Sequence, residues 1–230
     1  MKYDFILFDL DNTLFDYNRA EKNAFSKMLE IFCIEGNLET IREKYHKINL
    51  QLWQDFEKNL INAQDLRIER FRRFCRQENF DFDPAEMSRS YLKFLSEGTF
   101  LIENAVNVVS SVADRKIALI TNGFSEVQYP RLINSALSPY FNEIFISEEI
   151  GYSKPHPAIF EFVFKQMSHK DKNTAIIIGD SLNSDIKGGN DFGIATCWFN
   201  IYNHENKSDI KPDYEISELI ELLNIIRVHA

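Results

Sequence analysis

Six short apolar runs, each ending in small or acidic residues, constrain the fold of this chain more than any other feature. The runs are YDFILFDLD from residue 3, KIALITNG from 116, EIFISEE from 143, TAIIIGDS from 174, IATCWFN from 194 and DYEIS from 213. Near-continuous apolar runs of this kind are typical of strands buried on both faces of a sheet. Stretches with helical periodicity lie between them, at residues 126–137, 158–167, 184–191 and 217–226. The alternation predicts an α/β domain with a Rossmann-like, mainly parallel sheet and helices on both faces.

One long segment interrupts this alternation. From about residue 16 to residue 98 there is no strand pattern, and four amphipathic, charge-rich stretches occupy residues 20–32, 38–58, 63–78 and 84–95. A crossover between parallel strands needs far fewer residues than this. We therefore expect a core domain made of residues 1–15 and 99–230, with an inserted all-helical domain at residues 16–98. The polar segment 202–213 is expected to be an exposed loop.

Composition excludes several classes of partner. The 26 basic and 35 acidic side chains give a formal charge of −9, which argues against binding to a nucleic-acid polymer but not against binding a single nucleotide. No apolar window approaches the roughly 20 residues that span a bilayer, so no membrane partner is expected. The three cysteines are widely separated and show no metal-binding spacing, which favours reduced thiols and a cytoplasmic location.

Four aspartates lie where two of the apolar runs end. Asp9 and Asp11 follow the first run, and Asp180 and Asp185 follow the run that begins at residue 174. Residues i and i+2 of a strand point to the same face, so Asp9 and Asp11 are expected to converge if the first strand continues that far. Either pair alone equally fits an acidic turn or helix cap. If the two strands are neighbours, however, the four carboxylates share one crevice, and unit charges about 4 Å apart repel by several kcal/mol. Such a cluster needs a cation or a proton, and oxygen ligands without Cys or His favour Mg²⁺ over Zn²⁺.

Two other strand ends carry groups suited to a phosphate. Thr121 offers a hydroxyl, and Asn122 and Gly123 offer backbone N–H groups at a loop that leads into a helix. Lys154 is the basic residue of the four strand-end segments. Viewed singly, these features also fit an ordinary turn and a solvated surface lysine. Taken together with a Mg²⁺ site, they predict that the chain binds a phosphate group of its substrate.

Four short motifs in the sequence resemble the motifs of a known family. The chain resembles the haloacid dehalogenase superfamily of hydrolases: DLDNTL is similar to the DxDxT signature, ITNG to the Thr or Ser strand end, SKP to the basic motif and GDSLNSD to the GDxxxxD motif. The motifs occur in the family's order, and the helical insertion after the first one resembles a C1 cap. The resemblance implies a Rossmann-like core, a mobile cap and Mg²⁺ as cofactor.

The resemblance also assigns roles to residues by their position in the motifs. Asp9 would be the nucleophile that forms an aspartyl-phosphate, and Asp11 the general acid and base. The metal would be bound by Asp180, the Asp9 carboxylate and the main-chain carbonyl of Asp11, with Asp185 supporting it indirectly or through a water. The residues implied to bind the transferred phosphoryl group are Thr121, Asn122 and Lys154.

A longer stretch narrows the resemblance to a subgroup. Residues 118–160, especially TNGF, Gln128, Arg131 and SKPHPAIF, are similar to C1-capped nucleotidases that act on pyrimidine nucleoside 5′-monophosphates. The alternatives are a sugar-phosphate or phosphoglycolate phosphatase, a β-phosphoglucomutase, a 2-haloacid dehalogenase and a non-catalytic phosphate-binding protein. Dehalogenases of this superfamily typically lack an acid at the position of Asp11, so that residue favours phosphate chemistry. The aromatic side chains that would either stack on a base or pack in a core are Phe15, Tyr17, Trp53 and Phe56.

Two shorter strings point to other enzyme classes. GDSL at residues 179–182 matches a serine esterase signature, but that family also requires a DxxH motif, and none of the five histidines has an aspartate three residues before it. DFG at residues 191–193 matches a kinase motif, but the chain has no HRD sequence or glycine-rich loop. We set both interpretations aside.

Overall fold

The computed structural model describes residues 2–58 and 60–227. Its contacts divide the chain into two compact units. The first, here called the sheet unit, comprises Met1–Asp16, Phe100–Ser125 and Leu132–Ala230; the second, the helical unit, comprises Tyr17–Thr99 and Glu126–Arg131. Residues 126–131 therefore group with the helical unit, whereas the sequence analysis places them in the core.

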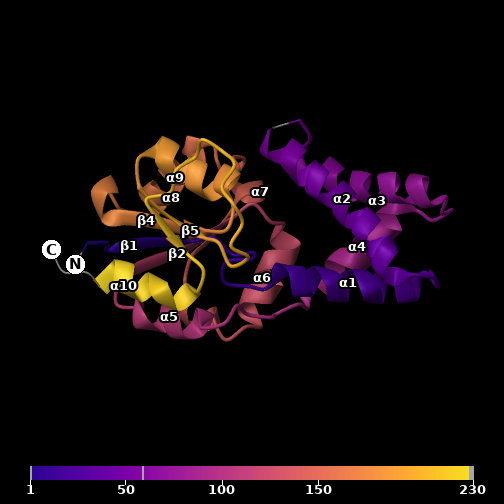
Figure 1. Ribbon diagram of the computed structural model, residues 1–230, viewed down its shortest axis with the longest axis horizontal. Helices are drawn as coiled ribbons and strands as arrows, with labels where there is room; N and C mark the ends of the chain where they lie inside the picture. Colours follow the sequence, from indigo (N-terminus) through magenta and orange to yellow (C-terminus); the bar gives the residue numbers. More distant parts are fainter. Residues whose placement is uncertain (1, 59, 228–230) are drawn as a thin grey trace. The chain divides into compact units, whose positions relative to one another are not determined.

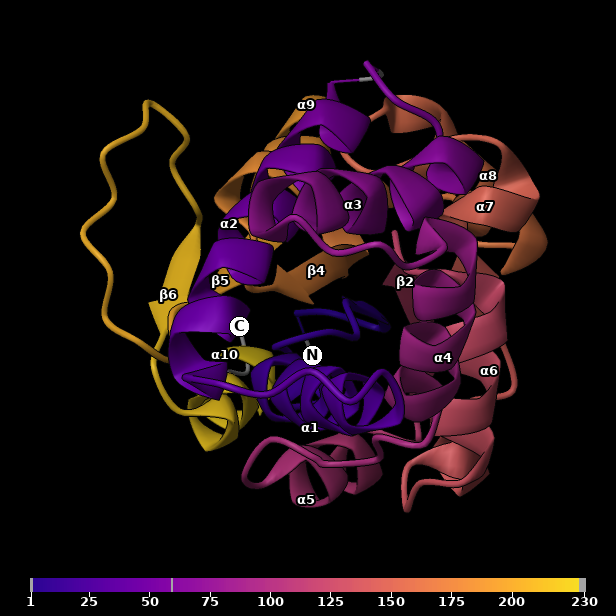
Figure 2. The same ribbon diagram turned by 90° about the vertical axis from the view of Figure 1, so that its right-hand side faces the viewer.

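Six parallel strands form the sheet, in the order β3-β2-β1-β4-β5-β6. They are β1 (Phe5–Phe8), β2 (Lys116–Thr121), β3 (Ile144–Ile146), β4 (Ala175–Gly179), β5 (Ala195–Phe199) and β6 (Tyr214–Ile216). Figure 2 shows β6 at one edge, preceded by the long loop that was expected at residues 202–213. The predicted parallel α/β sheet is confirmed, and every pairing is parallel.

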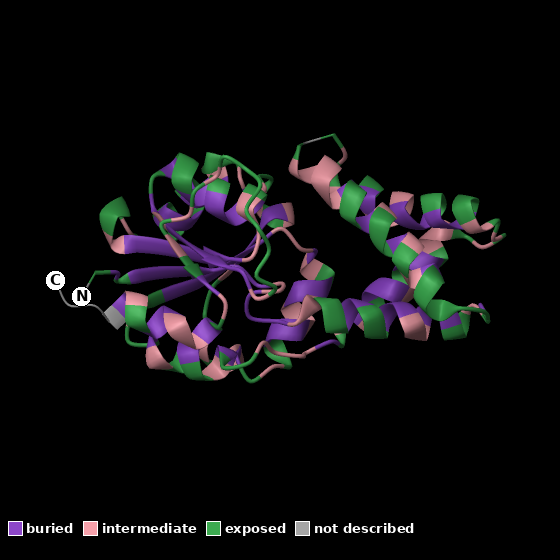
Figure 3. Ribbon diagram, viewed as in Figure 1, coloured by how far each residue is buried: buried purple, intermediate pink, exposed green. Residues whose placement is uncertain are grey.

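Alternate residues of each strand pack against different layers of helices. Ile6 and Phe8 belong to a core shared with α5 (Ala105–Ser111) and α10 (Leu222–Arg227), whereas Phe5 and Leu7 face α8 (Pro157–Gln166) and α9 (Lys187–Phe192). Figure 1 shows these two helix pairs on opposite faces of the sheet. Because both faces are covered, the strands are buried almost throughout (Figure 3), which explains their continuous apolar sequence.

The helical unit contains four helices from the predicted insertion and the central residues of α6 (Ser125–Ile133). The four are α1 (Tyr17–Ile31), α2 (Leu38–Glu57), α3 (Ala63–Glu78) and α4 (Pro84–Ser96). Asn37, Asn62 and Asp83 precede α2, α3 and α4, and each side chain accepts a hydrogen bond from a backbone N–H of the first turn. These caps satisfy donors that the helix itself leaves unpaired, so the sequence determines where the helices begin.

Aromatic side chains fill the interior of the helical unit. Tyr45 stacks on Phe25 and Phe71, with ring centroids 4.4 and 5.2 Å apart. Of the aromatic residues considered above as base-stacking groups, Phe15 is fully buried in the core of the sheet unit. Trp53 and Phe56 are half-buried and pack edge to face, 5.6 Å apart. Phe15 thus has a packing role.

Two α-helices in the described part of the chain were not predicted from the sequence. One is α5, whose seven residues AVNVVSS are too few to establish a helical period although Ala105, Val108 and Val109 form its buried side, and the other is α7 (Ser147–Ile150), a single turn. The predicted helix at 184–191 is in fact a π-helical turn, η3 (Leu182–Ile186), followed by α9. No helix within residues 2–58 and 60–227 combines the length and apolarity that crossing a bilayer requires.

Candidate active site

The carboxyl ends of β1 and β4 bring three aspartates together. Asp9 directly follows β1, Asp180 directly follows β4, and the two strands are neighbours. The backbone N–H of Asp9 donates to the carbonyl of Ile178, 2.8 Å away. The helix that leads into β2, α5, and the helix that follows β4, α9, pack on opposite faces of the sheet, and open α/β sheets form a ligand-binding crevice where the connections diverge in this way. Here Asp9, Asp180 and Asp185 each have a carboxylate oxygen within 4.8 Å of the others.

The position of Asp185 depends on the π-helical turn η3. The backbone N–H groups of Asp185 and Ile186 both donate to the carbonyl of Ser181, and the Ser181 N–H donates to Asp185 Oδ2 at 3.1 Å. Gly179 leaves room for this carboxylate, because a Cβ on Gly179 would lie 2.2 Å from Asp185 Cγ. A glycine at the end of β4 is therefore required for Asp185 to occupy its buried place.

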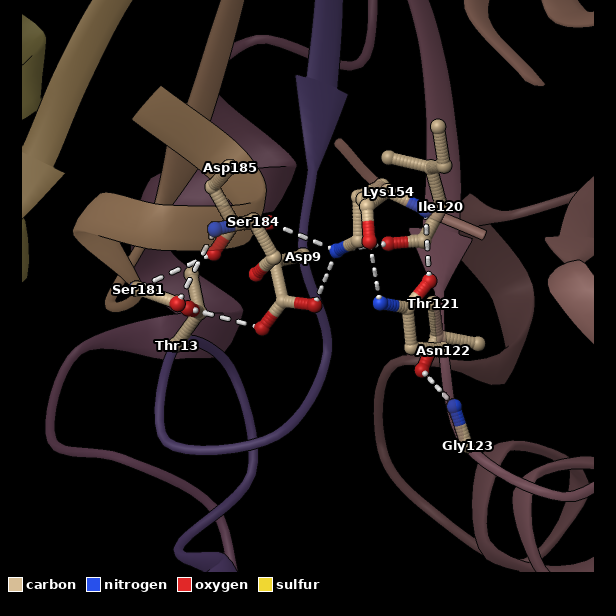
Figure 4. A network of polar contacts seen from close by, with 10 residues as sticks. All are labelled: Asp9, Thr13, Ile120, Thr121, Asn122, Gly123, Lys154, Ser181, Ser184 and Asp185. Atoms are coloured by element: carbon tan, nitrogen blue, oxygen red, sulfur yellow. Dashed lines mark hydrogen bonds and ion pairs between the residues drawn. The ribbon is translucent and has the colours of Figure 1, made fainter. Parts of the chain in front are cut away.

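Lys154 lies between two of the aspartates (Figure 4). Its Nζ is 2.6 Å from Asp9 Oδ1, 2.6 Å from Asp185 Oδ1 and 2.8 Å from the carbonyl oxygen of Ile120. These three contacts use all three donors of the ammonium group, and the side chain is only 1% exposed. Burial alone would lower the pKa of Lys154, but the charges of Asp185 and Asp9 outweigh it and raise that pKa. The lysine is therefore a fixed positive charge at the site.

The second oxygen of the Asp9 carboxylate accepts a hydrogen bond from the Thr13 hydroxyl, at 3.1 Å. Thr13 is fully buried and lies in a turn in which the N–H groups of Leu14 and Phe15 both donate to the Leu10 carbonyl. Thr13 was not among the predicted site residues, although it is the threonine of the DxDxT signature. With Lys154 on one oxygen and Thr13 on the other, the Asp9 carboxylate is held in one orientation.

Asp11 lies in the same turn, half-buried. The sequence argument put Asp9 and Asp11 on one face of a continuing strand, but β1 ends at Phe8 and the chain turns at Asn12, which has a φ of 58°. The Asp11 carboxylate is not part of the group of three described above. The turn, rather than strand alternation, sets its place beside Asp9.

The loop after β2 is joined to the segment that carries Lys154. Asn122 Nδ2 donates to the Lys154 carbonyl and Asn122 Oδ1 accepts from the Lys154 N–H, both at 2.9 Å. The Thr121 hydroxyl accepts from the N–H of Gly123 at 3.1 Å. The side chain of Asn122 thus orders two strand-end loops relative to each other, a role that the sequence analysis did not assign to it.

The crowded carboxylates change each other's proton affinity. Burial raises the pKa of Asp9 to about 7, with Asp185 and Asp11 adding to the rise and Lys154 opposing it. Burial, followed by the charges of Asp9 and Asp185, raises the pKa of Asp180 well above its ordinary value. One ammonium therefore does not balance the negative charge of this cluster.

The group of three fits a divalent cation. Its donors are carboxylate oxygens only, and among the described residues no Cys or His belongs to it. A hard cation such as Mg²⁺ prefers oxygen ligands and often binds one or two carboxylates while retaining waters. A cation at this place would also relieve the repulsion that raises the pKa of Asp9 and Asp180.

Comparison with known proteins agrees with this chemistry. Residues 3–193 match the family model of the haloacid dehalogenase-like hydrolases. The chain is 34% identical to pyrimidine 5′-nucleotidase PynA of Streptococcus pneumoniae, over 98% of this chain and 96% of that protein. It is 31% identical to pyrimidine 5′-nucleotidase YjjG of Escherichia coli, over the full length of both.

A solved structure resembles the whole chain. It is that of the HAD-hydrolase YfnB of Bacillus subtilis bound to magnesium, which is 35% identical to this chain and superposes with a TM-score of 0.92. The match covers 99% of this chain and 100% of the other. Similarity in sequence and in structure therefore extends over both units.

Proposed function

The chain belongs to the haloacid dehalogenase-like hydrolase family, and from that premise we propose that it is a Mg²⁺-dependent phosphatase acting on pyrimidine nucleoside 5′-monophosphates through an aspartyl-phosphate. The observation that carries the proposal is the buried Asp9 carboxylate, fixed by Lys154 and Thr13 and within 4.8 Å of two further carboxylates. The names of the relatives PynA and YjjG support the choice of nucleotide.

Asp9 is the proposed nucleophile. A carboxylate that attacks phosphorus divides hydrolysis into two steps, transfer to the enzyme and attack by water on the acyl-phosphate. Attack requires the ionised form, and burial, which raises the pKa of Asp9 to about 7, makes this form costly when no metal ion is bound. The contacts of Asp9 with Lys154 and Thr13 fix its rotamer, so that one reaction geometry is prepared before substrate arrives.

Asp11 is the proposed general acid and base. It would donate a proton to the leaving oxygen in the first step and take one from water in the second. Its half-buried position, in the turn that also holds Thr13, is compatible with both exchange with solvent and contact with a substrate. A halide leaving group needs no such proton, which is why this residue favours phosphate esters.

The remaining residues would bind the phosphoryl group and the cation. Lys154 is the cation closest to Asp9 and would neutralise phosphate oxygens, while Asn122 holds the loop after β2 against the Lys154 segment. Asp9, Asp180 and the main-chain carbonyl of Asp11 would hold Mg²⁺, and Asp185 would support the ion indirectly or through a water. When bound, the ion supplies positive charge that stabilises the transferring phosphoryl group.

A steady-state screen tests the proposal. The panel contains pyrimidine and purine nucleoside 5′-monophosphates, sugar phosphates and phosphoglycolate, each assayed with Mg²⁺ and with EDTA, and Asp9→Asn serves as the inactive control. We expect Mg²⁺-dependent release of phosphate, with kcat/KM highest for pyrimidine nucleotides. A sugar phosphate preferred over every nucleotide would contradict the substrate, and no metal-dependent turnover on any ester would contradict the phosphatase.

A further inference from the structure

The Asp180 carboxylate is held differently from the two carboxylates beside it. Lys154 donates to both Asp9 and Asp185, and each of these two carboxylates accepts a further hydrogen bond. Within residues 2–58 and 60–227, no donor forms a hydrogen bond to the Asp180 carboxylate. The direction of this carboxylate therefore depends on how the backbone of Asp180 is held.

A tryptophan of the neighbouring strand holds that backbone. Strands β4 and β5 pair in register as far as Gly179 and Trp198, so Asp180 is the first residue beyond the paired part of β4. The carbonyl of Asp180 accepts a hydrogen bond from Nε1 of Trp198 at 2.8 Å. The indole thus extends the link between the two strand ends by one residue.

Trp198 is itself fixed by packing. It is only 4% exposed, and its neighbours along β5, Cys197 and Phe199, lie in the core shared with α5 and α10. Because side chains alternate across a strand, Trp198 points to the other face of the sheet, where α8 and α9 pack. A buried indole N–H usually has a hydrogen-bond acceptor, and the Asp180 carbonyl supplies it.

The residue after Asp180 is held from the other side. The carbonyl of Ser181 accepts two backbone N–H groups of the turn η3, and its hydroxyl oxygen accepts a third at 3.2 Å. The carbonyl that Trp198 bonds belongs to the rigid peptide plane between Asp180 and Ser181. The indole therefore fixes this plane at the point where the chain leaves the strand and enters the turn.

We propose that Trp198 is a positioning residue for Asp180: by fixing the peptide plane after Asp180, it prepares that carboxylate to bind Mg²⁺. This inference rests on the proposed function, in which Asp180 holds the ion. Loss of a group that orients a metal ligand typically lowers metal affinity by about 10- to 100-fold. We expect the lower end of that range, because the indole bonds the backbone of Asp180 and not its carboxylate.

Trp198→Phe tests the inference, because it removes the N–H and keeps an aromatic ring on β5. The matched control is Phe199→Leu, which alters the next residue of β5, on the opposite face, and leaves the bond to the Asp180 carbonyl in place. Calorimetry should show Mg²⁺ binding about tenfold weaker in Trp198→Phe than in the wild type, and nearly unchanged in Phe199→Leu. Denaturant unfolding of both variants measures their stability.

The dependence of turnover on Mg²⁺ separates positioning from general damage. With uridine 5′-monophosphate as substrate, Trp198→Phe should need about ten times more Mg²⁺ for its half-maximal rate. Its kcat at saturating Mg²⁺ should be close to that of the wild type, because every side chain of the proposed site is unchanged. A variant that is merely destabilised would lose activity at every Mg²⁺ concentration.

The indole N–H of Trp198 gives a second readout that leaves the site unaltered. The chain has two tryptophans, Trp53 and Trp198, so the indole N–H resonance that remains in Trp53→Phe belongs to Trp198. This resonance should shift as Mg²⁺ is added, because its acceptor is the carbonyl of a proposed metal ligand. An unchanged resonance at saturating Mg²⁺ would overturn the inference, even if Trp198→Phe does not fold.

The outcomes distinguish this inference from the proposed function. Equal Mg²⁺ affinity in Trp198→Phe and Phe199→Leu, with an active wild type, would overturn the inference alone and leave Trp198 a core residue. A tenfold loss of affinity in Trp198→Phe, with no phosphatase activity in the wild type, would support the inference and contradict the proposed function. A wild type that binds no Mg²⁺ would overturn both.

Discussion

Replacing Asp180 with asparagine should stabilise the metal-free protein while weakening its response to Mg²⁺. The nearest oxygens of Asp9, Asp180 and Asp185 lie within 4.8 Å of one another, and two unit charges at that distance repel by about 3 kcal/mol at an effective dielectric constant of about 20. Asp180 takes part in two such repulsions, which its attraction to Lys154 partly offsets. Removing its charge should therefore stabilise the fold by about 2 to 3 kcal/mol.

Thermal unfolding in EDTA at pH 8 measures this gain. For a chain of this size, 2 kcal/mol corresponds to a rise in Tm of about 4 to 8 °C. The exposed Asp209, in the loop before β6, provides the matched control, since Asp209→Asn should leave Tm nearly unchanged. Added Mg²⁺ should raise the Tm of the wild type and of the control more than that of Asp180→Asn.

The pH dependence follows from the raised pKa of Asp180. The folded protein retains a proton on this group more readily than the unfolded chain does, so the wild type without metal loses stability as pH rises. The advantage of Asp180→Asn should accordingly shrink when the pH is lowered and the carboxyl group becomes protonated. A variant less stable than the wild type in EDTA at pH 8, or an equal response of both to Mg²⁺, would refute the reasoning.

Three further predictions concern other residues. Lys154→Met should lower the stability of the metal-free protein by about 3 kcal/mol or more, because it leaves two buried carboxylates without their cation; denaturant unfolding measures the loss, and an unchanged midpoint would contradict it. Gly179→Ala should displace the Asp185 carboxylate and weaken Mg²⁺ binding in calorimetry, whereas wild-type affinity would show that the site tolerates the methyl group. The Glu21 carboxylate, 3.7 Å away, raises the pKa of His46. The stabilisation from this His46–Glu21 pair is therefore complete below about pH 6.5 and is lost as the pH rises through the raised pKa. His46→Gln should flatten the dependence of stability on pH in this range, and an unchanged dependence would show that the pair does not stabilise the protein.

The strands could be predicted because a strand buried on both faces needs apolar residues at consecutive positions. Runs such as KIALIT and AIIIG are apolar at successive positions, and the residues that end them, Thr121 and Gly179, stand where the sheet stops. The same logic placed Asp9 and Asp180 at the ends of two strands. That these strands are neighbours was only a condition in the sequence analysis, and the pairing of β1 with β4 meets it.

Other features depend on contacts between distant parts of the chain. Hydrogen bonds to Asp9, Asp185 and the Ile120 carbonyl fix the position of the buried Lys154 ammonium. The spacing of residues in the sequence cannot identify a backbone carbonyl as one of these partners. The grouping of residues 126–131 with the helical unit is another such feature, and the bond of Arg131 to the Gly98 carbonyl is one of the contacts made there. Helical periodicity alone shows that a helix is present, not which unit it packs against.

The local turns also could not be predicted from sequence patterns. Asp11 was expected on a continuing strand, but the left-handed conformation of Asn12 and the two bonds to the Leu10 carbonyl end the extended chain. The π-helical turn that buries Asp185 depends on the space left by Gly179. In both cases a hydrogen bond or a steric gap between residues four to six apart decides the geometry.

Locating the phosphoryl group during turnover tests the central claim most directly. The wild type is mixed with Mg²⁺ and uridine 5′-monophosphate, quenched in acid within one turnover and analysed by peptide mass spectrometry, with Asp9→Asn treated in parallel. The account predicts a phosphoryl group on Asp9 in the wild type and none on the variant protein. Release of phosphate from the wild type with the group on another residue, or an Asp9→Asn protein as fast as the wild type, would contradict it.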